Sequence, residues 1–288
     1  LNGGWTNYAE SIYALAIYRG TLVAGLGRST GDGEVWQWDG SSWSKIGGDG
    51  VNSSWSGVQS IESLIVYNNE LYAGLGYATG NATIWKYDES AWTEIGGDDI
   101  NGSWTVGTYE RVRTLAVYNG ELYVGLGTTS GDGEAWRYDG ANWEKIGGNG
   151  INSGWAGTIE EVQSFSSYKG KLYAGTGNSG NADAAVWAWG DNVYLESNVS
   201  SFDTDWHHVA VTYDGSIARM YIDGVLDASA GKAISVATSS KPLLIGLGYG
   251  GREYGKPEAR FNGQLDELRL STIARTEFTT TPYANQPQ

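Results

Sequence analysis

Aromatic and amide side chains recur along this sequence in pairs that could bind sugar. Four asparagine–tryptophan pairs, each with the tryptophan three positions after the asparagine, repeat at spacings of 50, 49 and 51 residues between the tryptophans. The pairs are Asn2 and Trp5, Asn52 and Trp55, Asn101 and Trp104, and Asn152 and Trp155. An indole can cover the apolar side of a sugar ring while an amide bonds to its hydroxyl groups, and repeated shallow sites gain by avidity. The alternative is structural, with each asparagine closing a loop and each tryptophan packing between repeats.

Histidines and carboxylates offer little for catalysis. His207 and His208 are adjacent in an expected strand, where alternation sends the two rings to opposite faces and prevents joint binding of one metal ion. Glu10, Glu110 and Glu160 recur near the starts of the repeats, and a glycosidase would need two such carboxylates ~5–9 Å apart. A solvated rim is the simpler interpretation. We therefore expect no catalytic residues and no enzyme activity.

The sequence gives only weak signs of metal binding. Asp32 and Asp132 lie in Gly-Asp-Gly loops and could give oxygen ligands to calcium, but one carboxylate per loop is more typical of a turn. Asp203 and Asp205 form a further acidic pair. The sequence thus predicts no cofactor and no metal site, with calcium left as a possibility.

Charge and composition exclude several classes of partner. Lys and Arg total 18 against 33 Asp and Glu, a net charge of −15, which repels phosphate backbones and argues against nucleic acid. Apolar runs fall far short of the ~20 residues that cross a bilayer. An acidic, glycine- and tryptophan-rich chain without cysteine favours an extracellular or cell-surface location. Met220 is the only methionine, so we expect a processed form or a piece of a longer protein.

A unit of about fifty residues must position the asparagine–tryptophan pairs. In the third unit, apolar segments at 112–118, 121–127, 134–139 and 142–148 are separated by Asn-Gly, Gly-Asp-Gly and Asp-Gly turns, which predicts a four-stranded antiparallel meander. A second tryptophan recurs once per unit, at Trp36, Trp85, Trp136 and Trp187, and is expected to fill the space between units. Glycines alternating in the second strand leave room for the neighbouring sheet.

The repeat resembles a known family. The segment WSKIGGDGVNSSW at 43–55, followed by IESLIVYNNELYAGLG at 61–76, is similar to the repeats of tachylectin-2-type and kelch-like β-propellers. The resemblance covers about residues 1–190. It implies a non-catalytic propeller with one shallow sugar site per blade or pair of blades.

The period ends near residue 190, and a second pattern follows. The segments WHHVAVTYDG at 206–215, YIDG at 221–224 and FNGQLDELR at 261–269 resemble the concanavalin A-like, laminin-G-like jelly roll. The first half of that fold is missing, so the resemblance implies a partial sandwich with an uncovered face. The predicted domains are 1–190 and 191–288.

The sequence therefore predicts an all-β protein: a β-propeller-like array of four four-stranded blades joined to a partial jelly-roll sandwich. The function we expect is non-catalytic carbohydrate binding or adhesion, with glycans or cell-surface polysaccharide as partners. One alternative is a structural subunit of an extracellular assembly or filament, in which open sheet edges pair between copies. Another is an accessory module of a glycoside hydrolase.

Overall fold

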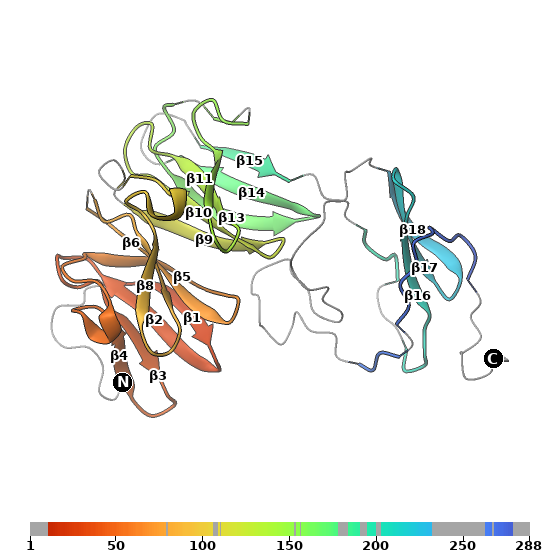
Figure 1. The fold of residues 1–288 in the computed structure, drawn as a ribbon, viewed down its shortest axis with the longest axis horizontal. Coiled ribbons are helices and arrows are strands. Elements are labelled where there is room, and N and C mark those ends of the chain that lie inside the picture. Colours follow the sequence, from red (N-terminus) through yellow and green to blue (C-terminus); the bar gives the residue numbers. More distant parts are fainter. Residues whose placement is uncertain are drawn as a thin grey trace. The chain divides into compact units, whose positions relative to one another are not determined.

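The computed structural model describes residues 11–78, 80–105, 109, 111–152, 154–155, 157–177, 184–190, 195–199, 203–231, 263–266 and 268–278. These residues form eighteen β strands and two short 3-10 turns, so the all-β prediction is confirmed (Figure 1). The chain forms two compact units. The first holds the described residues up to Ser167 together with those in Leu172–Trp189, and the second holds Tyr168–Lys171 and the described residues from Gly190 onward. No helix within the described ranges is long and apolar enough to span a membrane.

Four successive meanders make up the repeat region. The first contains β1 (Ser11–Tyr18), β2 (Thr21–Gly27), β3 (Val35–Trp38) and β4 (Trp43–Gly47). The second contains β5 (Ser60–Tyr67), β6 (Glu70–Gly76), β7 (Ile84–Tyr87) and β8 (Trp92–Gly96), and the third β9 (Val112–Tyr118), β10 (Glu121–Leu126), β11 (Glu134–Tyr138) and β12 (Trp143–Gly147). The fourth contains β13 (Val162–Tyr168), β14 (Lys171–Thr176) and β15 (Ala185–Trp189). The turns η1 (Val51–Ser53) and η2 (Ile100–Gly102) follow β4 and β8.

Turn chemistry explains why each unit folds as a meander. Between β9 and β10, Asn119 and Gly120 have φ of 51° and 70°, the left-handed conformations that a two-residue hairpin requires. Between β3 and β4, one carboxylate oxygen of Asp39 accepts the backbone N–H groups of Ser41 and Ser42 at 2.7 and 2.8 Å. Asp139 makes the same contacts in the third unit. These turns fix the register of strands that pair antiparallel throughout.

Neighbouring units pack through a glycine of one unit and a branched residue of the next. A Cβ built on Gly25 would lie 2.8 Å from Cγ2 of Ile61, in the first strand of the following unit. The same clash appears between Gly74 and Val112, at 2.5 Å, and it recurs at the next junction. The expectation that these glycines make room for the neighbouring sheet is therefore confirmed.

Tryptophans fill the rest of each junction, as the sequence predicts. Each tryptophan of the first set packs against one of the second set, at a steep angle. The pairs and their ring-centroid separations are Trp55 and Trp85 at 5.6 Å, Trp104 and Trp136 at 5.7 Å, and Trp155 and Trp187 at 5.7 Å. Trp36 belongs to the first unit, and its expected partner, Trp5, lies outside the described residues.

A separate three-stranded sheet follows the repeats. It contains β16 (Val209–Tyr213), β17 (Ile217–Ile222) and β18 (Val225–Gly231), paired antiparallel in that order. Ala218 and Tyr221 are its buried apolar residues among those described, whereas Val209, Val211 and Val225 are each more than half exposed. This sheet therefore buries far less apolar surface than the meanders do.

Candidate functional site

The tryptophans of the predicted sugar sites lie in the core of the repeat region. Trp55, Trp104 and Trp155 are 5%, 2% and 4% exposed. Their indole N–H groups donate to backbone carbonyls of the preceding unit: Trp55 to Gly33 at 2.7 Å, Trp104 to Ala82 at 2.6 Å, and Trp155 to Gly133. Each ring is thus covered by its neighbours and presents no open face on which a sugar could stack.

The asparagines of the same pairs close the loops between units. Asn52, Asn101 and Asn152 have φ of 54°, 54° and 51°, a left-handed conformation that asparagine tolerates well. Their side-chain amides donate to a backbone carbonyl six residues earlier, at 3.0, 3.3 and 3.0 Å. The described geometry therefore fits the structural alternative. Sugar binding by these pairs stays a prediction, and Asn2 and Trp5 lie outside the described residues.

The carboxylates considered for calcium act as turn residues. Oδ2 of Asp32 accepts the backbone N–H of Ser29 at 2.9 Å, and Oδ2 of Asp132 accepts that of Thr129 at 3.3 Å. Within the part of the chain that the structure describes, no three potential metal ligands gather into a site. Glu10 and Glu110 are outside the described ranges, so the rim they were expected to form with Glu160 cannot be traced.

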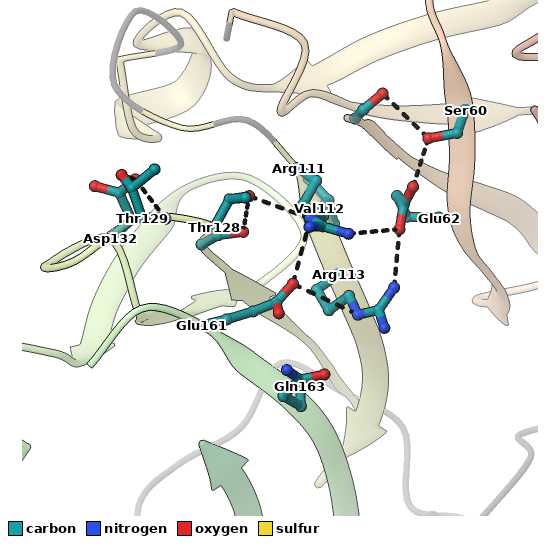
Figure 2. Close-up of polar contacts among 12 residues, drawn as sticks. Ser60, Glu62, Arg111, Val112, Arg113, Thr128, Thr129, Asp132, Glu161 and Gln163 are labelled. Carbon is teal, nitrogen blue, oxygen red and sulfur yellow. Dashed lines mark hydrogen bonds and ion pairs between the residues drawn. The ribbon is translucent and has the colours of Figure 1, made fainter. Parts of the chain in front are cut away.

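Charged side chains from three units meet across β5, β9 and β13, at positions that correspond from unit to unit (Figure 2). Glu62 contacts Arg113 at 3.0 Å and Arg111 at 3.7 Å, while Glu161 contacts Arg111 at 3.4 Å and Arg113 at 3.5 Å. The two glutamate side chains are 0% and 2% exposed, and the two arginines 16% and 32%. We call these four residues the inner charge cluster.

The inner charge cluster contains two negative and two positive side chains, so its charges balance. Burial raises the pKa of Glu161, and the guanidinium groups of Arg111 and Arg113 oppose that shift. A buried carboxylate is expensive unless it is paired, so each glutamate needs arginines supplied by the neighbouring unit. The cluster therefore links the second and fourth units to the third through buried charges. Its sequence signal is the run of charges inside otherwise apolar strands, as in Arg111-Val112-Arg113, which repeat-based reasoning passed over.

A second polar cluster lies at the start of the C-terminal sheet. His207 is held between two carboxylates, with Nδ1 at 2.8 Å from Oδ2 of Asp223 and Nε2 at 3.0 Å from Oδ1 of Asp203. Asp223 has φ of 50° in the turn between β17 and β18, and its other oxygen accepts the backbone N–H of His208 at 2.8 Å. Trp206, next in sequence to this pair of histidines, is 65% exposed.

The carboxylates stabilise the charged imidazole. Hydrogen bonds to Asp223 and then Asp203 raise the pKa of His207. The bond from His207 in turn lowers the pKa of Asp223, and the backbone N–H of Asp205, followed by His207, lowers that of Asp203. His207 is thus held between two carboxylates whose side chains are 67% and 45% exposed, and its neighbour in sequence is the exposed Trp206. We call Asp203, Trp206, His207 and Asp223 the Trp206 cluster.

Comparison with known proteins places the Trp206 cluster in a recognised segment. Residues 164–278 match the Laminin_G_3 family, described as the concanavalin A-like lectin/glucanases superfamily. The predicted resemblance of the C-terminal part is confirmed. This concanavalin A-like segment spans less than half of the chain, begins within β13 and contains all four residues of the Trp206 cluster.

Other comparisons are less informative. One similar solved structure is titled "Crystal structure of WD40 beta propeller domain of Doa1". It is 15% identical in sequence, has a TM-score of 0.38, and the match covers 75% of this chain and 66%, slightly less than two thirds, of that chain. A search of curated proteins found no match.

Proposed function

We propose that this chain is a non-catalytic carbohydrate-binding protein of the cell surface or extracellular space, and that the Trp206 cluster contacts the sugar. The observation that carries the proposal is an exposed indole, next in sequence to a histidine held by two largely exposed carboxylates, within a concanavalin A-like lectin/glucanases segment. The family description supports a role connected with carbohydrate, and the arrangement of the cluster supports a specific place for it.

The chemistry of the cluster suits a sugar ring. Trp206 offers an apolar face to the C–H side of a pyranose, and the carboxylates of Asp203 and Asp223 accept hydrogen bonds from its hydroxyl groups. His207 acts as a positioning residue, because both of its ring nitrogens already contact carboxylates. With its nitrogens occupied, His207 is poorly placed to move a proton at the ligand, which favours binding over catalysis.

An accessory module of a glycoside hydrolase is a second candidate, because the matched family description includes glucanases as well as lectins. Such a module would bind the same class of polymer that its enzyme cleaves. Release of reducing ends from a bound polysaccharide would contradict the non-catalytic proposal.

A glycan array with the full chain, followed by calorimetry on the best ligand, tests both the function and the site. Because each factor of ten in affinity is about 1.4 kcal/mol, losing the indole platform in Trp206→Ala should weaken binding by about tenfold. The matched control is Tyr77→Ala, which removes a ring that is 46% exposed in the repeat region. Absence of binding to every glycan would overturn the function, and undiminished binding by Trp206→Ala would overturn only the site.

A further inference from the structure

The two ends of the repeat array carry opposite halves of an interface that the chain already forms three times. Between adjacent units, the first strand of the later unit lays a branched residue on a glycine of the earlier unit. The leading face, on β1, consists of Ile12, Leu15 and Ile17. The trailing face, on β14 and β15 of the fourth unit, consists of Gly175 and Val186.

The leading face begins at Ile12, whose equivalents are buried in the other units. Ile12 is 49% exposed, whereas its equivalents Ile61, Val112 and Val162 are each 0% exposed. The register of β1 with β2 pairs Ile12, Leu15 and Ile17 with Leu26, Ala24 and Leu22. Paired positions share a face of the sheet, and Leu15 and Ile17 are 60% and 53% exposed. The three side chains therefore form one continuous apolar surface.

The trailing face is also exposed to solvent, although the equivalent positions of the earlier units are buried. Val186 is 75% exposed, whereas its equivalents Val35, Ile84 and Ala135 are 0%, 0% and 3% exposed. In each earlier unit the residues of this face are covered, and in the fourth they are not.

The glycine at the centre of the trailing face is an empty socket among the described residues. Gly25, Gly74 and Gly125 each receive a side chain of the following unit, with their built Cβ atoms 3.0, 2.9 and 2.9 Å from the Cβ of Ile61, Val112 and Val162. For Gly175, the described atom within 4 Å is Oγ of Ser164, which belongs to the same sheet.

We propose that the leading face of one copy of this chain docks on the trailing face of a second copy, with Ile12 seated on Gly175. The occupant is a second copy because the socket has the shape of this repeat, and because the contact continues an interface that the chain builds three times. Such a contact joins two different surfaces, so it makes a ring if the rotation closes and a filament if it does not. This proposal is independent of sugar binding.

Cysteine cross-linking tests the contact directly, because the chain contains no cysteine of its own. Ile12→Cys and Gly175→Cys are prepared separately, mixed and oxidised. At the internal junctions the equivalent Cβ positions lie 2.9–3.0 Å apart. This is closer than the ~3.5–4.5 Å of a disulfide, so a small outward shift allows the bond and the mixture should give a covalent dimer. Ser41→Cys, in an exposed turn, mixed with Ile12→Cys is the control and should give at least about tenfold less dimer at the same concentration and time.

The double variant Ile12→Cys/Gly175→Cys separates a contact between copies from closure within one chain. A cross-linked monomer in the double variant, without dimer in the mixture, would overturn the proposal in favour of a closed ring. Sedimentation gives a second readout without cysteines. The natural chain should form concentration-dependent oligomers, and Ile12→Asp, at an already half-exposed position, should remain monomeric with an unchanged circular dichroism spectrum. A natural chain that stays monomeric at all concentrations would also overturn the proposal.

Discussion

Tryptophan has opposite roles in the repeat region and in the C-terminal sheet. Trp55, Trp104 and Trp155 recur at one position of each repeat and are buried, with their N–H groups on backbone carbonyls. Trp206 occurs once, outside the period, and is 65% exposed. A tryptophan that recurs at every junction packs there, whereas Trp206 lies outside the repeat and has most of its surface open to solvent.

The polar clusters of the two regions differ in the same way. In the inner charge cluster, Glu62 and Glu161 are almost fully buried and depend on arginines from a neighbouring unit. In the Trp206 cluster, Asp203 and Asp223 hold His207 yet remain largely open to solvent. Buried pairs make the fold sensitive to loss of either partner, while exposed pairs contribute little to stability and stay accessible.

The largest expected effect is on the packing of the repeat region. Trp104→Ala removes a ring that packs between Trp136 and Trp143 and leaves a cavity, so it should lower the free energy of unfolding by about 3–5 kcal/mol. Trp206→Ala should change it by less than about 0.5 kcal/mol, as exposed substitutions usually do. Equilibrium urea unfolding of the two variants checks the contrast. Equal losses would mean that the two regions do not differ as the structure indicates.

The second effect concerns the buried charges. Arg113→Gln leaves Glu62 buried with Arg111 at 3.7 Å as its remaining arginine contact, and should cost about 3 kcal/mol of unfolding free energy. Adding Glu62→Gln to the same chain should recover part of that loss, because the unpaired charge is then gone. The exposed pair of Arg219 and Asp214 is the matched control, and Arg219→Gln should cost less than about 1 kcal/mol.

A different result would change the interpretation of the inner charge cluster. If Arg113→Gln and Arg219→Gln were equally mild in urea unfolding, water would have to reach Glu62, and the cluster would contribute little to holding the units together. If Glu62→Gln made Arg113→Gln worse, the glutamate would be stabilising through its bond with Ser60 rather than through the arginines.

The repeat period was enough to predict most of the fold, because it reports packing that every unit shares. The turn at Asn119 and Gly120 and the small residue at Gly25 follow from local conformation and from the close approach of sheets. The function of Trp55 and Asn52 could not be predicted in the same way. An indole and an amide suit a sugar and a packed junction equally well, so their types and spacing alone do not separate the two roles.

The polar clusters were harder to predict, since their members are distant in sequence. Glu62 and Arg113 meet only because β5 and β9 lie side by side. The sequence of either strand alone does not predict which residue the other strand will supply. Strand alternation was expected to separate the roles of His207 and His208, but both residues precede β16, which begins at Val209. Nor does alternation show that a preceding loop and a later turn supply Asp203 and Asp223.

The smallest expected effect is the pH dependence of the Trp206 cluster. The pKa of His207 is raised above 6.5, so its contribution to stability is fully present below pH 6.5 and is lost as the pH rises through the raised value. The pKa values of Asp203 and Asp223 are lowered from 3.8, so their contribution is present above that pH and is lost as the pH falls through the lowered values. The cluster should therefore be most stable between these limits.

Proton NMR checks this directly, since the chain has only two histidines and His207→Gln assigns both. The His207 ring should titrate above pH 6.5, and His207→Gln should remove the loss of stability on the alkaline side while leaving the urea unfolding of the repeat region unchanged. A His207 ring that titrates below pH 6.5 would mean that the two carboxylates do not hold it in solution. Because Asp203 and Asp223 are also the proposed sugar contacts, that result would weaken the case for Trp206 as a binding platform.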